Sequence, residues 1–261
     1  MSAYPGIDGA LFVVTGAAGG QGREETLLLA SQGASVLAAD IRDDADDLLR
    51  AASDLPGTVT YRRLDVTDED DWAALAASLD GASVRGLVNN AGITSRIRIG
   101  DVERDGWDRV FAVNVTGPML GIQALMPLMG EGSSIVNIGS AAAVTGHYTA
   151  AYAGSKWALR GLTHSCATEL GARGIRVNIV HPGYIETEMT ASAPPSFRAA
   201  NIAVSPLRRV GQPDDVAHAV VFLLSDGAAY ITGTEIGVDG GQHYSGVATF
   251  LSDAVRPQQT H

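Results

Sequence analysis

Cysteine is nearly absent from this sequence. Cys166 is the only one among 261 residues, so no disulfide can form within the chain, and zinc or iron–sulfur sites built from four thiolates are excluded by count. Basic residues are also scarce, because 18 Lys and Arg residues stand against 29 Asp and Glu residues and leave a net charge of −11. Nucleic acids and anionic membranes bind basic faces, so we expect neither as a partner.

Long apolar runs and leader-like features are missing as well. No window of about 18 consecutive apolar residues occurs, and residues 1–9 have no basic start. We therefore expect no membrane span, no signal peptide and a cytoplasmic location, which also suits a chain with one cysteine. The histidines are scattered, and the acidic group at 43–47 lacks the glycine and the later glutamate of a calcium loop, so no metal site is predicted.

The composition and the periodicity of the sequence indicate a folded α/β domain. Apolar residues make up 46% and charged residues 18%, which is enough for one domain spanning residues 1–261. Short β-branched runs alternate with longer helical patterns. The predicted strands are 11–15, 34–40, 59–65, 85–89, 134–140, 175–180 and 234–238. The predicted helices are 21–31, 43–53, 67 or 68 to 79, 101 or 106 to 129 with a bend at 117–118, 148–171 and 213–225.

Repeated alternation of strand and helix predicts parallel pairing through right-handed crossovers. The strands are almost wholly apolar, so both faces of the sheet should be covered. We therefore expect an α/β fold, a single-domain Rossmann-like doubly wound parallel seven-stranded sheet with helices on both faces. Two segments lack a clean pattern, namely 182–206 and the residues 243–261, which we expect to form a C-terminal surface tail.

A glycine-rich loop joins the first strand to the first helix. Gly16, Gly20 and Gly22 form a Gly-x-x-x-Gly-x-Gly pattern, which lets a backbone approach a pyrophosphate at a helix N-terminus, although glycines also serve ordinary turns. Asp40 ends the second strand, where an acid can bind the adenosine ribose hydroxyls and repel a 2′-phosphate. This pattern favours NAD(H) over NADP(H). The alternatives are that Asp40 caps the next helix and that Arg42 softens the preference.

Tyr152 and Lys156 lie four residues apart on a predicted helix and so share one face. A neighbouring ammonium, helped by a nicotinamide cation, would lower the pKa of the phenol from near 10 toward about 7 and create an acid/base. The same spacing occurs by chance in surface helices. Ser140 ends the fifth strand, where α/β sheets place ligands, although alone it is typical of a loop serine.

The sequence resembles the short-chain dehydrogenase/reductase family over essentially its whole length. The matching segments are 15–22, Asp65-Val66, Asn89-Asn90-Ala91-Gly92, Asn114, Ser140, 152–156, Pro182-Gly183, 230–233 and 238–241. Gln21 departs from the family, because an apolar residue often stands there, and it would alter the pyrophosphate contacts. Within the family, 155–162 and 180–190 are similar to bacterial hydroxysteroid and secondary alcohol dehydrogenases, although 3-oxoacyl carrier-protein reductases share most of these residues.

The resemblance implies a role for each matching residue. Tyr152 would be the acid/base and Ser140 would orient the carbonyl. Lys156 would lower the Tyr152 pKa and hold the nicotinamide ribose, and Asn114 would support a water-linked proton relay to Lys156. The implied cofactor contacts are Gly16, Gly19, Gln21, Gly22, Asp40, Ile41, Asp65, Val66, Asn90, Ala91, Gly92, Tyr152, Lys156, Pro182, Gly183, Ile185 and Thr187. The family also implies a homotetramer.

The family's substrate loop would fall at about 184–207. Its apolar residues could close a lid over a hydrophobic substrate, or could pack on one another or on a neighbouring subunit. The opposite wall would be 94–99 and 141–147, and Arg96 and Arg98 could bind an acidic group of a substrate or face solvent. The candidate substrate contacts are Ala142, His147, Tyr184 and Met189.

We therefore predict an NAD(H)-dependent oxidoreductase that interconverts a hydrophobic secondary alcohol, hydroxysteroid-like or cyclic or aryl, and its ketone. One alternative is a 3-oxoacyl carrier-protein reductase that uses NADPH, whose acidic partner would need a basic patch such as Arg208-Arg209 or Arg96 with Arg98. Asp40 and the overall acidity of the chain disfavour this alternative. The remote alternative is a non-catalytic dinucleotide-binding regulator, which the presence of Ser140, Tyr152 and Lys156 disfavours.

Overall fold

The computed structural model describes residues 4–255, which form a seven-stranded sheet. The strands are β1 (Leu11–Thr15), β2 (Ser35–Asp40), β3 (Thr58–Arg63), β4 (Val84–Asn89), β5 (Ser134–Ile138), β6 (Arg176–Pro182) and β7 (Glu235–Val238). Their order is β3-β2-β1-β4-β5-β6-β7, and every neighbouring pair is parallel. The predicted doubly wound α/β sheet is confirmed.

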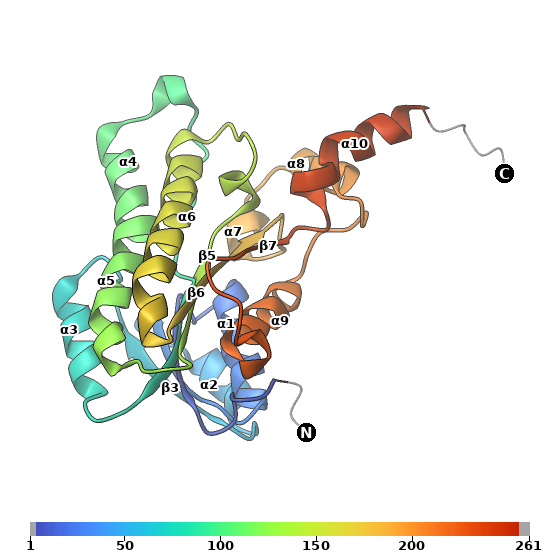
Figure 1. The fold of residues 1–261 in the computed structure, drawn as a ribbon. Helices are drawn as coiled ribbons and strands as arrows, with labels where there is room; N and C mark the ends of the chain where they lie inside the picture. Colours follow the sequence, from blue (N-terminus) through green and yellow to red (C-terminus); the bar gives the residue numbers. More distant parts are fainter. Residues whose placement is uncertain (1–3, 256–261) are drawn as a thin grey trace.

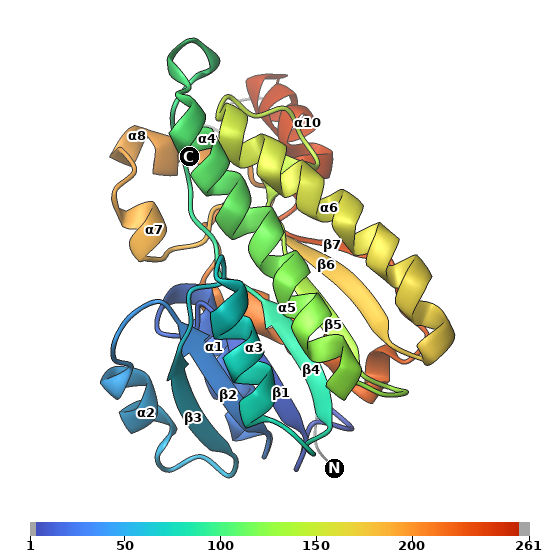
Figure 2. The ribbon, with the colours of Figure 1, turned by 90° about the vertical axis from the view of Figure 1, so that its left-hand side faces the viewer.

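Helices cover both faces of the sheet (Figures 1 and 2). They are α1 (Gly20–Ser31), α2 (Asp46–Ala52), α3 (Glu69–Ser78), α4 (Arg104–Phe111), α5 (Gly117–Leu125), α6 (Ala150–Leu170), α7 (Glu188–Ala191), α8 (Pro195–Val204), α9 (Pro213–Leu224) and α10 (Gln242–Val255). Phe12 and Val14 of β1 pack in one core with α1 and α9, whereas Val13 packs in the other with α3, α5 and α6. A strand buried on both sides needs apolar residues at every position, which explains the continuous apolar runs.

The strand order reverses between β1 and β4, at the centre of the sheet. The chain leaves β1 toward one side of the sheet and β4 toward the other, so the connections diverge at their carboxyl ends. A crevice opens at such a switch point, and open α/β sheets bind their ligands there. The glycine loop follows β1 and Asn90 follows β4, so the fold brings both to this crevice.

The long helix expected near 101–129 runs from Arg104 to Leu128 and contains a π-helical turn at Ala112–Thr116. Pro118 has no N–H, so the carbonyl of Asn114 lacks its α-helical donor, and the N–H of Gly117 bonds the more distant carbonyl of Ala112. By length and composition alone this helix would suffice to cross a membrane. It packs instead against β4, α3 and α6, as a core helix does.

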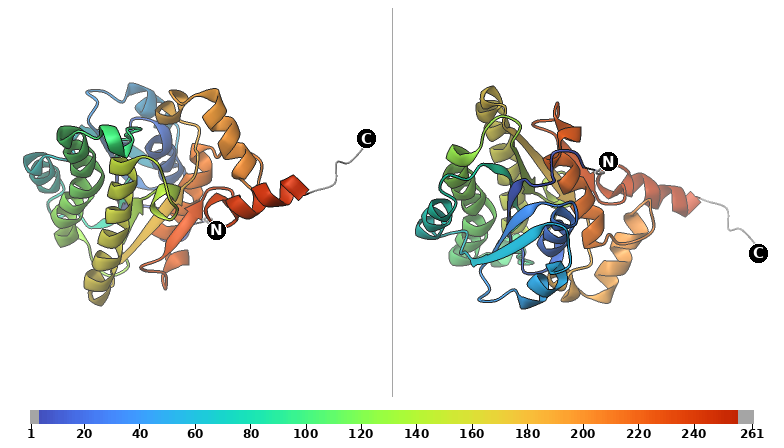
Figure 3. Two further views of the ribbon diagram at one scale, coloured as in Figure 1. Left: turned by 90° about the horizontal axis from the view of Figure 1, so that it is seen from above. Right: turned by 90° about the horizontal axis from the view of Figure 1, so that it is seen from below.

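Two weakly patterned segments are more regular than the sequence indicates. Residues 182–206 contain the helices α7 and α8. Separately, the helix predicted over 43–53 is shorter than expected, because α2 begins at Asp46. The described part of the predicted surface tail is the helix α10, which packs on α8 and projects from the body (Figure 3). Its start is held by His243 against Asp239 at 2.6 Å, and Arg208 pairs with Asp253 farther along. Residues 256–261 of that tail lie outside the described range.

Candidate active site

The loop between β1 and α1 has a fixed shape that only glycine permits. Gly16 has a φ of +66°, and a Cβ there would lie 2.8 Å from the Cα of Ala91. A Cβ at Gly22 would lie 2.3 Å from the carbonyl oxygen of Gly16. Asn90 holds the loop from β4, because its Nδ2 donates to the carbonyls of Thr15 at 3.0 Å and Gly16 at 3.1 Å. The N-terminus of α1 is thereby presented to the crevice, with no side-chain cap from its glycine N-cap.

A cleft of about 350 Å³ lies over this loop. Eleven of the predicted cofactor contacts line it, namely Gly16, Gly19, Gln21, Asp40, Ile41, Asp65, Val66, Asn90, Ala91, Gly92 and Thr187. Gly22 lies beneath it against Gly16, the Ile185 side chain packs into the core, and Pro182 and Gly183 line the neighbouring cleft. The glycine cradle and the uncapped helix N-terminus fit a dinucleotide pyrophosphate. The buried Oε1 of Gln21 has no hydrogen-bond partner in the described protein, which a polar ligand in this cleft could supply.

Asp40 enters this cleft from the end of β2. Its two carboxylate oxygens accept backbone N–H groups at 3.0 and 3.2 Å. It does not cap α2, which begins at Asp46 after an alanine N-cap, so that alternative is wrong. Arg42 lies beside Gly19 and forms an ion pair with Glu188 at 2.6 Å. Asp40 therefore has no ion pair, whereas Arg42 is already paired. Asp65 and Arg109 also line the cleft, and neither forms an ion pair within residues 4–255.

The second group of predicted residues meets where β5 ends and α6 begins. Tyr152 and Lys156 share a face of α6, with Lys156 Nζ 5.9 Å from the centroid of the Tyr152 ring. Lys156 is 5% exposed and donates to the carbonyl of Ile138 at 2.7 Å, and burial lowers its pKa to about 8. Ser140 hydrogen-bonds the phenol of Tyr152, and its Oγ accepts the N–H of Ala142 at 3.1 Å.

Without a nicotinamide cation the pKa of Tyr152 is raised, so the predicted lowering, which includes that cation, stays a prediction. Burial raises the pKa of the phenol, and this effect exceeds the opposite effect of the hydrogen bond from Ser140. The ammonium of Lys156 is directed at the carbonyl of Ile138 rather than at the phenol oxygen. Tyr152 therefore stays a neutral hydrogen-bond donor unless further positive charge reaches the site.

Asn114 connects the π-helical turn to the loop after β4. Its side chain accepts the N–H of Ile93 at 2.9 Å and donates to the carbonyl of the same residue at 3.0 Å and to Ser155 Oγ at 3.0 Å. A Cβ at Gly92 would lie 3.2 Å from Asn114 Oδ1 and 3.5 Å from Lys156 Nζ, so both groups border the same small space. The fold thus brings Asn114 next to Lys156, although they are far apart in the sequence.

Two residues that sequence reasoning did not select support Ser140. His181 is 1% exposed, and its Nδ1 accepts the N–H of Ser140 at 3.2 Å while its Nε2 lies 3.1 Å from Glu235. Burial lowers the pKa of His181, so the neutral ring with its proton on Nε2 is favoured. Arg160 pairs with the same Glu235 at 2.7 Å. No sequence signal marks this group, because its members meet only when β6, β7 and α6 pack together.

A smaller cleft of about 150 Å³ opens in front of Ser140 and Tyr152. All four predicted substrate contacts line it, namely Ala142, His147, Tyr184 and Met189. Met189 also lines the larger cleft, so the two clefts adjoin there. On the outer side, Tyr148 and Phe197 of α8 meet edge to face, with ring centroids 6.4 Å apart. The arrangement brings the Ser140 hydroxyl and the Tyr152 phenol into the cleft that adjoins the one over the glycine loop.

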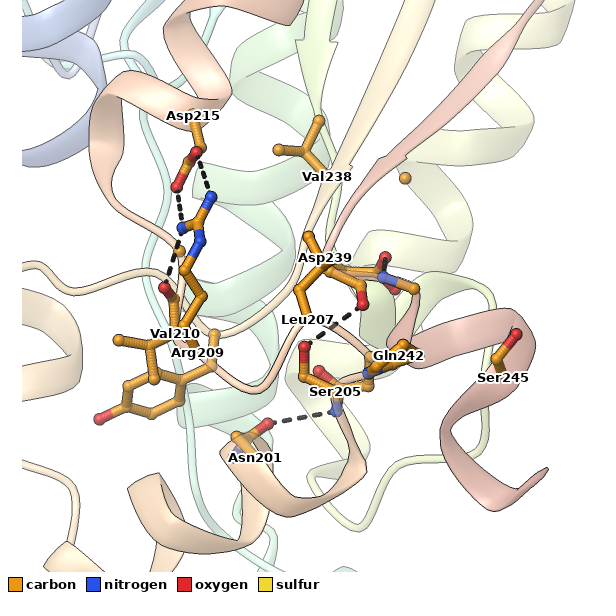
Figure 4. Close-up of a pocket in the computed structure, with 16 residues that line it drawn as sticks. Asn201, Ser205, Leu207, Arg209, Val210, Asp215, Val238, Asp239, Gln242 and Ser245 are labelled. Carbon is orange, nitrogen blue, oxygen red and sulfur yellow. Dashed lines mark hydrogen bonds and ion pairs between the residues drawn. The ribbon is translucent and has the colours of Figure 1, made fainter. Parts of the chain in front are cut away.

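A larger cavity of about 510 Å³ lies beside this cleft, among α8, α10 and β7 (Figure 4). Tyr184, Asn201 and Gln242 line both spaces. The polar groups of the cavity are paired with each other, as Arg209 is with Asp215 at 2.6 Å and Gln242 with Asn201 at 3.2 Å. It therefore offers no acid/base group comparable to Tyr152. Across residues 4–255, no three His, Cys, Asp or Glu side chains are grouped as metal ligands.

The parallel sheet, the glycine cradle and the grouped Ser140, Tyr152 and Lys156 define an oxidoreductase of the dinucleotide-binding Rossmann class. The family model described as Enoyl-(Acyl carrier protein) reductase matches residues 16–243. The chain belongs to the short-chain dehydrogenase/reductase family, whose members bind a nicotinamide dinucleotide. The resemblance found in the sequence is confirmed.

Several curated relatives match nearly the whole chain. A cis-4-hydroxycyclohexanecarboxylate dehydrogenase of Sinomonas cyclohexanicum is 40% identical, over 88% of this chain and 94% of the relative. A 3-oxoacyl-[acyl-carrier-protein] reductase of Thermotoga maritima is 39% identical, over 90% and 98%. A 3-alpha-(or 20-beta)-hydroxysteroid dehydrogenase of Mycobacterium tuberculosis is 38% identical, over 89% of each chain. These proteins have different substrates, so the family is shown and the substrate is not.

Solved structures agree with the fold. A putative NAD(P)-dependent gluconate 5-dehydrogenase from Beutenbergia cavernae, with bound NADP, superposes with a TM-score of 0.85. It is 35% identical over 90% of this chain and 97% of that chain. This likeness extends through the cofactor half and the substrate half of the sheet.

Proposed function

We propose that this protein is an NAD(H)-dependent dehydrogenase that interconverts a compact cyclic secondary alcohol and its ketone. The observation that carries the proposal is the position of Ser140 and Tyr152 in a small cleft that adjoins, at Met189, the cleft over the glycine loop. At about 150 Å³ the substrate cleft is smaller than the roughly 300–1,000 Å³ of most ligand pockets, which favours a single ring over a steroid. The cyclic substrate in the name of the Sinomonas relative supports the same size class.

The chain's own residues supply proton transfer and orientation. When bound, a nicotinamide dinucleotide exchanges the hydride and, in its oxidised form, adds a positive charge near the phenol. Ser140 Oγ and the Tyr152 hydroxyl hold the substrate oxygen, and Tyr152 accepts the alcohol proton during oxidation or donates one to the carbonyl during reduction. His181 fixes the backbone of Ser140. Lys156, with a pKa of about 8, is mostly protonated at pH 7 and holds the ribose hydroxyls. Asn114 positions the Ile93 loop and supports a proton path toward Lys156.

The preference for NAD(H) rests on charge. Asp40 brings a carboxylate to the cleft where the adenosine ribose would lie, and a 2′-phosphate there would be repelled. Arg42 is the cation two residues after Asp40, and its charge is already engaged by Glu188 at 2.6 Å, while Arg109 lines the same cleft from α4. These contacts favour NAD(H), with NADP(H) as the weaker cofactor.

The carrier-protein reductase activity is the second candidate, because the Thermotoga relative is named for it. Its acidic partner would require free basic side chains near the cleft. Arg208 and Arg209 do not meet that need, since they pair with Asp253 and Asp215. Arg96 and Arg98 have no ion pair within residues 4–255, but Asp40 in the cofactor cleft disfavours NADPH and the net charge of −11 disfavours an acidic partner. We therefore place this reaction second.

Initial rates decide between the two candidates. The panel is cyclopentanol, cyclohexanol, an aryl secondary alcohol, a hydroxysteroid and a 3-hydroxyacyl thioester, each with NAD⁺ and with NADP⁺, followed by the matching ketones with NADH and NADPH. Turnover of the monocyclic alcohols with NAD⁺ supports the proposal. Turnover confined to the thioester with NADP⁺ contradicts it and favours the carrier-protein reductase.

We also propose a cytoplasmic homotetramer. Trp157 on α6 is 48% exposed, and α10 exposes Tyr244, Val247 and Leu251 on one side of its helix. Apolar surface of this kind is commonly covered by other subunits. Light scattering after gel filtration gives the mass directly, and a monomer would contradict the proposal.

A further inference from the structure

The substrate cleft has an unusual charge for this protein. The chain carries a net charge of −11, yet no Asp or Glu lines the cleft in front of Ser140 and Tyr152. Among the lining residues, Arg96 is the one lysine or arginine. His147 adds no second positive charge near neutral pH, because burial lowers the pKa of its ring. The cleft is therefore locally cationic within an acidic molecule.

Arg96 differs from three other arginines near the clefts, although Arg98 and Arg109 of the cofactor cleft also have no ion pair within residues 4–255. Arg42, Arg198 and Arg209 each pair with a carboxylate. Arg96 instead donates to two neutral acceptors, Ser192 Oγ at 2.9 Å from Nη1 and the carbonyl of Met189 at 3.1 Å from Nη2, and it has no ion pair within the described range 4–255. A guanidinium has five N–H donors, so three remain beyond these two bonds. The neutral contacts orient the group and leave its charge uncompensated.

The neighbouring side chains complete the mouth of the cleft. Arg98 lies over the ring of Tyr148, with its Cζ 4.7 Å from the ring centroid, and Tyr148 lines the cleft. This contact fixes a second positive charge behind the ring. Arg96 and Tyr148 both also border the shallow opening next to Phe197. An anion at the mouth would therefore meet Arg96 directly and Arg98 at longer range.

We propose that the substrate is a hydroxy acid whose carboxylate is bound by Arg96 while its hydroxyl lies between Ser140 and Tyr152. The inference rests on the proposed function, because it assigns the second end of the same substrate. A carboxylate can accept two parallel N–H···O hydrogen bonds from one guanidinium. Since Arg96 lies away from the reacting carbon, it binds ground state and transition state alike, and its loss raises KM more than it lowers kcat.

Matched substrates and variants test this proposal. The substrates are 3-hydroxycyclohexanecarboxylate, its methyl ester and cyclohexanol, assayed with NAD⁺ at low and at 0.5 M NaCl. The variants are Arg96→Met, Arg96→Lys and the control Arg104→Met, which removes an arginine paired with Asp108 outside the cleft. Arg96→Met should lower kcat/KM for the acid by about 10- to 100-fold, mainly through KM, and should leave the ester and cyclohexanol within about twofold. Arg96→Lys should recover part of the lost kcat/KM, and 0.5 M NaCl should lower kcat/KM for the acid only.

Calorimetric titration of the same acid and ester, with and without NADH, keeps the inference separate from the proposed function. Arg96-dependent binding of the acid without turnover of any alcohol would retain the inference and overturn the proposed function. Turnover of cyclohexanol with no preference for the acid over the ester would overturn the inference alone. An equal loss on acid and ester in Arg96→Met would also overturn it, because that pattern marks a structural role.

Discussion

The dinucleotide cleft and the substrate cleft lie on the same edge of the sheet, but they are built differently. The first rests on the ends of β1, β2 and β4 and on α1, which buries Gly22, Glu25 and Thr26. The second is bounded on its outer side by α7 and α8, neither of which has a buried residue. One cleft is part of the core, and the other is closed by a surface segment.

This difference separates what holds the cofactor from what selects the substrate. The glycine loop is held by backbone contacts and by Asn90, which leave no room for a Cβ atom at Gly16 or Gly22. The outer segment is held by exposed pairs such as Arg198 with Glu186 and Arg96 with Ser192, and exposed pairs contribute little stability. Segments of low local stability can open and close over a ligand. The same scaffold can thus keep one cofactor while its relatives accept different substrates.

The largest effect is expected at the proposed acid/base of the substrate cleft. Tyr152→Phe removes the proton donor and acceptor but keeps the ring, so kcat should fall by about 10²- to 10⁴-fold while NADH binding stays unchanged. Stopped-flow rates and NADH fluorescence titration measure the two quantities. Retained turnover in this variant would show that the proton moves through another group.

The rigidity of the cofactor half is tested by Gly22→Ala. Its Cβ would lie 2.3 Å from the Gly16 carbonyl oxygen, so the loop must shift, and the Kd for NADH should rise by about 10-fold or more. The control is Gly106→Ala in α4, where nothing lies within 4 Å of the added atom and Ala should stabilise the helix by about 0.5–1 kcal/mol. Equal Kd values in the two variants would mean that the loop is adaptable.

A third test uses the acid buried beneath that loop. Glu25 is fully buried with both oxygens unpartnered in the described protein, and burial raises its pKa to about 8. An unfolded glutamate has a pKa near 4.3, so between about pH 4.3 and pH 8 the folded protein binds a proton that the unfolded chain releases. The free energy of unfolding should therefore fall as the pH rises through this window.

Glu25→Gln removes this titration and keeps the shape. The variant should gain several degrees in Tm over the wild type at pH 8.5 and less at pH 5. The control, Glu24→Gln, changes a carboxylate that is paired with Arg23 at 2.5 Å. A gain for Glu25→Gln that is the same at both pH values would contradict the buried-acid explanation.

The smallest effect on stability is expected in the outer segment. Arg198→Ala removes the exposed pair with Glu186, so Tm should change by less than about 2 °C. KM for the alcohol should nevertheless change, because α8 carries Phe197 at the cleft. A large fall in Tm with an unchanged KM would reverse the comparison and make this segment part of the stable core.

Much of the cofactor half could be predicted from the sequence. Continuous apolar runs such as 11–15 mark strands buried on both faces, and glycine at 16 and 22 marks places where backbones come too close for a side chain. These are local signals, because the residue type and its position follow directly from a steric or burial requirement. The substrate half has fewer of them, and α7, α8 and α10 were not predicted because their apolar residues do not face a continuous core.

The sequence by itself determined the sheet, the glycine cradle and the residue types of the catalytic group, since each depends on local periodicity or on a short motif. Only the tertiary structure decided the charge state and the neighbours of those groups. Burial raises the pKa of Tyr152. His181 and Glu235 meet behind Ser140, and Arg96 is left as an unpaired cation in an acidic protein. The physical reason is that desolvation and charge pairing depend on distances between segments far apart in the chain, which no local pattern encodes.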